Sequence, residues 1–166
     1  MDRQLSVRHR LGWRTRGVLL VAAAGLAGLL GLARTLVPDP RGFGTHLQLG
    51  LRPCAFATVT ARLCPTCGMT TAFAWFTRGR VDRSWRANPA GCLFALFSIP
   101  LMAWLVACAV RGEPIGFESL TGPLMGLLLA SVAFSLMSWL IRLIVSPAAL
   151  AGPGPGSGEL ARPLGL

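Results

Sequence analysis

The sequence predicts an all-α fold, a polytopic helical membrane protein with three transmembrane helices. Hydrophobic residues make up 53% of the 166 positions and charged residues only 13%, and the mean hydropathy of +0.59 lies above the usual range of soluble domains. The apolar residues gather in three runs, 17–37, 89–110 and 122–145. Each run is about as long as a helix must be to cross the hydrocarbon core of a bilayer. We therefore expect one membrane domain over residues 17–146.

The chain begins with a basic segment, residues 1–16, which holds a single acid and five arginines: Arg3, Arg8, Arg10, Arg14 and Arg16. Arginine beside a span favours the cytoplasmic side, so we predict a cytoplasmic arm. The apolar run that follows is interrupted only by Arg34. Its length exceeds the apolar core of a typical signal peptide, which favours an uncleaved anchor. A cleaved signal peptide is the alternative, because Gly31-Leu32-Ala33 offers small residues at a cleavage position.

Helix start and stop signals place the other two spans. Asn88 is a typical N-cap residue and Pro89 suits the first helical position, so the second span should begin there. Thr121-Gly122-Pro123 starts the third span, and Ser146-Pro147 ends it. Residues 147–166 are rich in Gly and Pro and predict a disordered tail.

A short helix is predicted over residues 65–78, after a connector, residues 41–62, in which no long element is indicated. Pro65 suits the first helical position, and Arg78-Gly79 supplies a C-terminal stop signal. The segment is apolar but too short to span a bilayer. We therefore expect an interfacial or re-entrant helix beside the three spans.

The formal net charge is +10, and all 16 basic side chains are Arg. In a soluble protein this charge would suggest nucleic acid, but here the arginines flank apolar runs, where they meet anionic lipid headgroups. We expect contact with the lipid bilayer and no nucleic acid binding. The residues predicted to contact lipid phosphates or other anions are Arg78, Arg80, Arg83 and Arg86. The exclusive use of Arg and the absence of Tyr suggest a GC-rich bacterial genome, and so a multi-pass protein of the bacterial inner (plasma) membrane.

Two of the five cysteines lie in one motif, Cys64-Pro65-Thr66-Cys67-Gly68. If a helix starts at this motif, the helix dipole favours the Cys64 thiolate, so we predict a thiol more acidic than usual. Cys92 and Cys108 fall within the second apolar run, where cysteine behaves as a small hydrophobe. The motif pair and Cys54 remain as the candidates for chemistry.

We consider four interpretations of these candidate cysteines. A Cys-x-x-Cys-Gly turn points two sulfurs at one metal ion, as in zinc knuckles, and Cys54 and His46 could complete a zinc site with Cys64 and Cys67. The same pair could instead form a redox dithiol, although no strand precedes it as in α/β oxidoreductases. A disulfide from Cys54 to either motif thiol requires an oxidising compartment. In the fourth interpretation the thiols stay reduced and pack a tight helix start.

The order of these residues resembles a known family. Cys54 is followed by Cys64-Pro65-Thr66-Cys67-Gly68-Met69-Thr70-Thr71-Ala72, then by Arg78-Gly79, and finally by Asn88-Pro89 at the start of an apolar run. In this order and spacing the stretch resembles the bacterial membrane-protein family DUF2752, a domain of unknown function. The resemblance implies a small polytopic bacterial membrane protein and brings no established activity, substrate or cofactor. Many members carry arginine where this chain has Thr71, so a role of that arginine does not transfer.

We therefore expect a small integral membrane protein in which the Cys-Pro-Thr-Cys-Gly helix is a structural or binding element, rather than an enzyme. The alternative is a membrane thiol-redox or zinc-binding protein that uses Cys64 and Cys67, with Cys54 as third partner. A component of a transporter or channel is a third class. So short a chain would then need a homo-oligomer or another membrane partner, and the spans lack the acids that proton-coupled carriers use.

Overall fold

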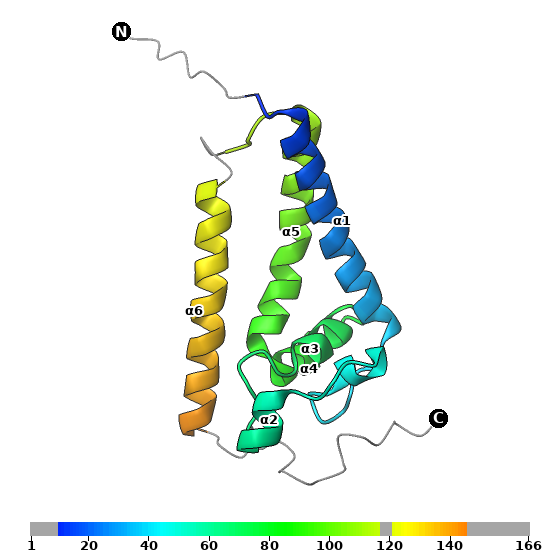
Figure 1. The fold of residues 1–166 in the computed structure, drawn as a ribbon, viewed down its shortest axis with the longest axis vertical. Helices are drawn as coiled ribbons and strands as arrows, with labels where there is room; N and C mark the ends of the chain where they lie inside the picture. The colour runs from blue at the N-terminus through cyan, green and yellow to red at the C-terminus, as the bar shows by residue number, and fades with distance from the viewer. Residues whose placement is uncertain (1–9, 117–120, 146–166) are drawn as a thin grey trace.

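The computed structural model describes residues 10–116 and 121–145, and these residues form helices and connecting loops without a strand. Three helices are long: α1 (Trp13–Thr35), α5 (Pro89–Arg111) and α6 (Thr121–Val145). Four short helices lie between α1 and α5, namely η1 (Thr45–Leu49), α2 (Ala55–Thr60), α3 (Met69–Phe76) and α4 (Val81–Ala87) (Figure 1). The predicted all-α fold is confirmed. Residues 1–9 of the predicted arm and the predicted tail, 147–166, lie outside the described residues.

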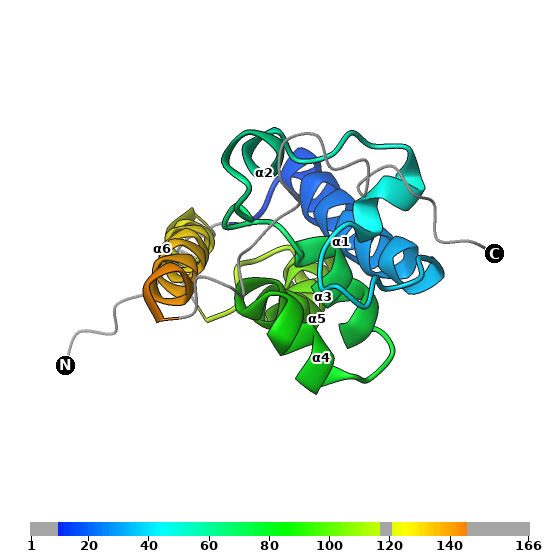
Figure 2. The ribbon, with the colours of Figure 1, turned by 90° about the horizontal axis from the view of Figure 1, so that it is seen from below.

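α1 and α5 contact each other directly at one end and diverge toward the other, where α3 lies between them (Figure 1). The direct contact is a buried cluster formed by Leu19, Ala23, Leu105, Cys108 and Ala109. At the wide end, Phe73 of α3 packs with Ala33 of α1 and Ala95 of α5. Seen from below, the short helices gather under the ends of α1 and α5 (Figure 2). The short helix beside the spans is therefore enclosed by protein.

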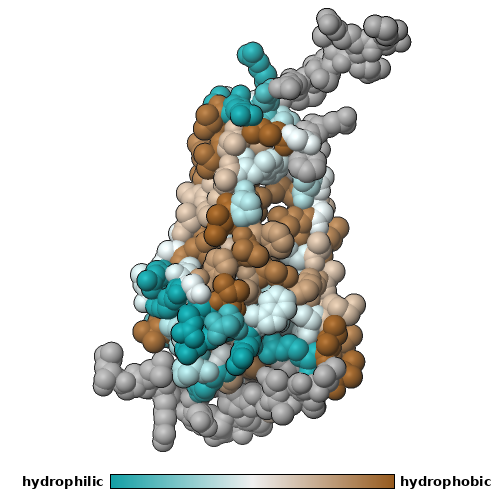
Figure 3. All heavy atoms as spheres, turned by 180° about the vertical axis from the view of Figure 1, so that it is seen from behind, coloured by the Kyte–Doolittle hydropathy of each residue, from teal (hydrophilic) through white to brown (hydrophobic). Residues whose placement is uncertain are grey.

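Each of the three long helices is long and apolar enough to cross a membrane. Large apolar side chains on them face outward: Val110 keeps 68% of its surface exposed and Ile144 72%. An apolar surface this extensive is typical of lipid contact. Seen from behind, hydrophobic residues fill the middle of the molecule and hydrophilic residues gather at its two ends (Figure 3). The predicted arrangement of three apolar spans is confirmed.

The C-terminal ends of α1 and α5 are each capped by an arginine from elsewhere in the chain. The last carbonyl groups of a helix lack partners within it. The Arg16 guanidinium donates to the carbonyl oxygens of Ala109 (2.6 Å) and Val110 (3.2 Å) near the end of α5. α1 begins at Trp13, inside the segment predicted as a basic arm, and therefore includes Arg16. Arg78 caps α1 by donating to the oxygens of Ala33, Arg34 and Leu36.

The short helix differs from its prediction in its bounds. It begins at Met69 rather than at Pro65 because Gly68, just before it, has φ +85°. This left-handed conformation cannot continue a right-handed helix. Residues 65–68 form turns instead. The sequence patterns also give no sign of α4, which is fixed to α3 by a hydrogen bond of 2.8 Å from the Ser84 hydroxyl to the Ala72 carbonyl.

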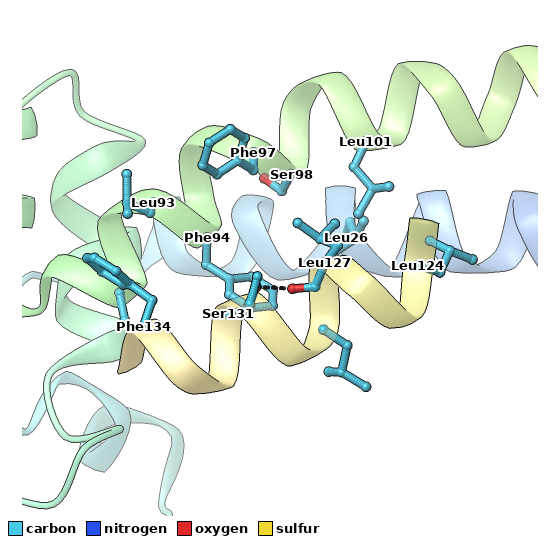
Figure 4. A pocket seen from close by; sticks show the side chains of 13 residues that line it. Leu26, Leu93, Phe94, Phe97, Ser98, Leu101, Leu124, Leu127, Ser131 and Phe134 are labelled. Atoms are coloured by element: carbon cyan, nitrogen blue, oxygen red, sulfur yellow. Dashed lines mark hydrogen bonds between the residues drawn. The ribbon is translucent and has the colours of Figure 1, made fainter. Parts of the chain in front are cut away.

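α6 packs less closely than α1 and α5. Between its first half and α5 lies a cavity of about 460 Å³, which Leu26 of α1 also lines (Figure 4). Ser98 and Ser131 are on its wall, but their hydroxyls donate to carbonyl oxygens of their own helices at 2.7 and 2.6 Å. The cavity is thus almost wholly apolar. Near its other end, Trp139 and Leu143 of α6 pack against the buried pair Ala57 and Leu63.

Candidate metal centre

Three cysteine sulfurs meet at the end of the molecule that holds the short helices. Cys54 precedes α2 as its N-cap residue, and Cys64 and Cys67 lie in the turn before α3. The Sγ atoms of all three lie within 4.8 Å of one another, and each cysteine is partly buried with a free thiol. The structure thus brings together the three cysteines that the sequence singles out.

The motif folds into two overlapping turns that bring its sulfurs together. The Cys67 N–H donates to the Cys64 carbonyl (3.1 Å), and the Met69 N–H donates to the Thr66 carbonyl (3.1 Å). As a result, the Sγ atoms of Cys64 and Cys67 are 3.0 Å apart. The Thr66 hydroxyl oxygen lies 3.2 Å from the Cys64 Sγ. Main-chain hydrogen bonds therefore help to position the two sulfurs of the motif.

Gly68 is required by this turn for two separate reasons. Its φ of +85° is a conformation that residues with a Cβ rarely adopt. A Cβ at this position would also lie only 2.6 Å from the Gly42 carbonyl oxygen and 2.8 Å from that of Ala87. The cysteine turn thus packs main chain directly against main chain, which only glycine permits.

Asn88 fastens the cysteine turn to the start of α5. Its side-chain amide donates to the carbonyl oxygens of Pro65 (3.1 Å) and Cys67 (3.0 Å). Its side-chain oxygen accepts from the Gly91 N–H (2.9 Å), as the sequence predicts for an N-cap residue. Asn88 is only 3% exposed. The predicted cap therefore has a second role, which sequence reasoning missed, in holding the site.

The two thiols of the motif differ in acidity. Burial alone would raise the pKa of Cys64, but its hydrogen bonds with Thr66, Cys67 and Cys54 outweigh burial, so this pKa lies below that of an ordinary thiol. Burial raises the pKa of Cys67 well above the ordinary value, and its hydrogen bond with Cys64 adds to the increase. The direction for Cys64 agrees with the sequence prediction, but the cause does not, because Cys64 does not lie at a helix start.

The C-terminal half of α6 covers one side of the site. Trp139 donates from its indole Nε1 to the Leu63 carbonyl oxygen (2.8 Å), and its ring meets the edge of Phe56 at a centroid distance of 6.3 Å. Arg142, one turn further on, lines a small cavity of about 10 Å³ together with Cys64 and Cys67.

The remaining predicted ligand and the other cysteines lie elsewhere. His46 is the second residue of η1. It is outside the group of close metal-binding side chains, which, within the part of the chain that the structure describes, consists of cysteines only. Cys92 and Cys108 are buried in α5, at 3% and 0% exposure, as expected of thiols that act as small hydrophobes.

The four arginines predicted to contact lipid phosphates differ in their surroundings. The Arg78 guanidinium donates hydrogen bonds to main-chain carbonyl oxygens. In the sequence, the Arg-Gly stop signal is the only sign of this role. Arg80 forms an exposed ion pair with Asp82 (3.5 Å). The guanidinium of Arg83 lies 4.7 Å from the centroid of the Trp75 ring, and Arg86 is exposed. Lipid contact stays a prediction for these side chains.

Thr71, the position at which the family resemblance fails, is completely buried. Its hydroxyl lies 2.8 Å from that of Thr45, which in turn accepts a hydrogen bond from the Asp39 N–H (3.0 Å). Asp39 is paired with Arg41 at 2.8 Å. This chain therefore uses the position to connect α3 with η1 and the loop before it.

The spacing of the three sulfurs suits a metal ion that prefers thiolates. Zn²⁺ binds thiolate sulfur at about 2.3 Å, so two sulfurs of a tetrahedral site lie about 3.8 Å apart. The sulfurs of the motif pair are 3.0 Å apart and no two of the three sulfurs are more than 4.8 Å apart, which is close to this value. Small side-chain rotations would therefore be enough to bind the ion. Three protein ligands leave a fourth position for water or another ligand, as in reactive zinc sites.

Comparison with known proteins gives a family for the part of the chain that holds this site. Residues 54–106 match the model of a family described as protein of unknown function (DUF2752). Over this stretch the chain is similar to the DUF2752 family. The DUF2752 region starts at Cys54 and contains all three clustered cysteines and Asn88, whereas α6 follows it. No curated protein and no solved structure matches the chain.

Proposed function

We propose that the DUF2752 region of this chain binds a thiophilic metal ion, with Zn²⁺ as the first candidate, through Cys54, Cys64 and Cys67. The observation that carries the proposal is the convergence of three Sγ atoms within 4.8 Å. They come from two segments that are separate in the sequence. In the proposed setting, the site lies where the spans of a multi-pass bacterial inner-membrane protein reach the membrane surface.

The surroundings of the sulfurs support a site that is built before the ion arrives. Gly68 allows the main chain to approach closely, and Asn88 holds the two carbonyl groups of the turn. Ligands that are already in position lose less conformational entropy when the metal binds, so the free-energy cost of binding is smaller. Partial burial of the thiols also lowers the local dielectric, which strengthens the attraction between thiolates and a cation.

Metal content of the detergent-purified protein tests the proposal. We expect one equivalent of zinc per chain, and we expect Co²⁺ substitution to give the thiolate-to-cobalt absorption of a tris-thiolate site. Cys67→Ser should abolish both signals, as should the same change at Cys54 or Cys64. Cys92→Ala is the matched control, since Cys92 is a buried cysteine in α5.

The outcomes separate a real site from general thiol affinity. Metal retained by Cys92→Ala and lost from each of the three serine variants supports the proposal. Wild-type protein that binds no Zn²⁺ or Co²⁺ at micromolar concentrations contradicts it. A loss of metal from Cys92→Ala as large as from the serine variants also contradicts it, because metal binding would then depend on the integrity of the fold rather than on the three clustered cysteines.

A second function, thiol–disulfide exchange, is favoured by the 3.0 Å separation of the Cys64 and Cys67 sulfurs. The Cys64 thiolate would attack a substrate disulfide, breaking its S–S bond and forming a mixed disulfide as the departing thiolate takes a proton. Cys67 would then lose its proton and attack the Cys64 sulfur, which expels the second substrate thiol. The substrate disulfide gains two electrons and two protons, and the protein ends with a Cys64–Cys67 disulfide.

The side of the membrane on which the cysteines lie distinguishes the two functions. α1 begins at the end of the molecule opposite to the cysteines (Figure 1), so a cytoplasmic start places the site on the outer face. Disulfides persist there and not in the cytoplasm. Labelling of Cys64 with a membrane-impermeant maleimide from each side gives the answer. Labelling from the cytoplasm alone excludes a stable disulfide and leaves the metal site.

A further inference from the structure

Arg142 places a positive charge beside the cysteine site. It lines the cavity of about 10 Å³ that Cys64 and Cys67 also line, and its side chain is partly buried. Within residues 10–116 and 121–145, no hydrogen bond or ion pair engages its guanidinium. Arginine stays charged inside proteins. A partly buried charge without a counter-charge is unfavourable, so the site itself should supply one.

Carboxylates do not fill this role in the part of the chain that the structure describes. Asp39 is held by Arg41 at 2.8 Å, and the exposed Asp82 is held by Arg80 at 3.5 Å. Glu113 follows the C-terminal end of α5, at the opposite end of the molecule from the last turns of α6 (Figure 1). The groups in the cavity that can become negative are therefore the cysteine sulfurs.

We infer that Arg142 is the counter-charge of the metal–thiolate centre. This inference rests on the proposed metal site, because three thiolates and one divalent cation leave one net negative charge. A single guanidinium neutralises that charge. The cavity that Arg142 shares with Cys64 and Cys67 has room for about one water molecule, so little water in this cavity screens the arginine from the two sulfurs. It is a positioning residue for the centre and not a metal ligand.

The packing of the C-terminal half of α6 explains how the charge of Arg142 comes to lie beside the cysteine site. α6 is separated from α5 by the apolar cavity over its first half (Figure 4). Near its other end, Trp139 and Leu143 join the buried cluster around Ala57 and Leu63. This contact brings Arg142, one turn away from Trp139, to the cysteines. A helix outside the DUF2752 region thus completes the electrostatics of a site inside it.

Two substitutions at one position separate charge from packing. Arg142→Gln removes the charge but keeps a polar side chain, whereas Arg142→Lys keeps the charge. Arg111→Gln is the matched control, because Arg111 lies in the last turn of α5 at the other end of the spans. We expect Arg142→Gln to weaken Zn²⁺ and Co²⁺ binding by roughly 10–100-fold, as is typical of groups that support metal ligands. Arg142→Lys should lose far less, and Arg111→Gln nothing.

A second readout uses the metal-free protein, so it does not depend on the proposed function. Anionic iodoacetate and neutral iodoacetamide alkylate the same thiolate, but a nearby cation attracts only the anionic reagent and so raises the ratio of the two rates. We expect the ratio of the two rates at Cys64 to fall in Arg142→Gln and to stay high in Arg142→Lys. Size-exclusion elution in detergent checks that each variant is folded.

The combined outcomes decide between the two proposals. Wild-type protein without metal binding overturns the proposed function, and the alkylation ratio then tests the placement of Arg142 by itself. An unchanged ratio in Arg142→Gln overturns the inference, as does a loss of metal affinity in Arg142→Lys equal to that in Arg142→Gln. A fall in the ratio that only Arg142→Gln shows supports it.

Discussion

The side-chain amide nitrogen of Asn88 lies 3.0 Å from the carbonyl oxygen of Cys67. This hydrogen bond joins the start of a membrane-spanning helix to the cysteine turn, and a second one reaches the Pro65 carbonyl (3.1 Å). Because the opposite side of the same amide caps α5, one side chain controls both helix start and site geometry. The Asn-Pro step that follows the cysteine motif in the sequence is therefore part of the site.

Substitutions at Asn88 should separate these two roles. Asn88→Asp keeps the oxygen that caps α5 but loses both donors, so we expect the cap to remain and metal affinity to fall roughly 10–100-fold. Asn88→Ala also loses the cap, which adds a cost of about 1 kcal/mol. Thermal unfolding in detergent and Co²⁺ titration measure the two effects. Equal metal affinity in Asn88→Asp and wild type would show that the two donors do not position the site.

Replacing Gly68 should be far more damaging than replacing another glycine with positive φ. Gly68→Ala introduces both the unfavourable conformation and a Cβ 2.6 Å from the Gly42 carbonyl oxygen. Gly79 has φ +74° with open space around it, so Gly79→Ala incurs only the conformational cost, about 1 kcal/mol. We expect a clear difference in midpoint temperature and loss of metal binding only in Gly68→Ala. Similar midpoints for the two variants would contradict close main-chain packing at Gly68.

The sequence predicts the spans well because each depends on local information. Runs of apolar residues predict α1, α5 and α6, and the N-cap chemistry of Asn88 predicts the first residue of α5. The start of α3 is missed because Gly68 acts through close approach to Ala87 and Gly42, which are distant in the sequence. Taken alone, Pro65 suggests that a helix starts at residue 65. In the structure, residues 65–68 form turns instead.

The candidate site likewise contains some residues that local patterns predict and others that they do not. Cys54, Cys64 and Cys67 are recognised by residue type and spacing. The exclusion of His46 from the cluster depends on the path of residues 42–54, which no local pattern specifies. Arg142 is separated from the motif by more than two helices along the chain, and only tertiary packing of α6 brings it to the cysteines. No acidic residue lies near Arg142 in the sequence, so no local pattern shows that its charge has a particular role.

The acidity of the two motif thiols gives a pH-dependent prediction. Thiolate is the reactive form, and the pKa of Cys64 is lowered while that of Cys67 is raised. In the metal-free protein, the midpoint of the Cys64 alkylation profile should therefore lie at a lower pH than that of an ordinary thiol. Cys67 should remain unreactive as the pH rises through the ordinary thiol pKa. Mass spectrometry after timed alkylation, from pH 5 to 10, measures both profiles; faster modification of Cys67 would contradict the assignment.

The hydroxyl of Thr66 contributes to this difference and can be removed alone. Thr66→Val eliminates its hydrogen bond to Cys64 (3.2 Å) and keeps a β-branched side chain. We expect the midpoint of the Cys64 alkylation profile to move to higher pH. Thr70→Val, in the first turn of α3, is the control and should leave the profile where it is. A shift of the same size in both variants would assign the effect to local packing.

Arg78 should stabilise the fold more than the arginines near it. Its guanidinium donates to four carbonyl oxygens, of which the closest are Leu36 (2.7 Å) and Ala74 (2.8 Å), and so joins the end of α1 to α3. Charged hydrogen bonds of this kind predict a loss of about 1–3 kcal/mol in Arg78→Ala. Arg78→Lys should be only a partial substitute, because an ammonium group cannot match the planar fork of a guanidinium. Arg86→Ala removes an exposed arginine and should leave the unfolding midpoint unchanged. If Arg86→Ala lowers the midpoint as much as Arg78→Ala does, lipid contact rather than helix capping accounts for the stabilising effect of these arginines.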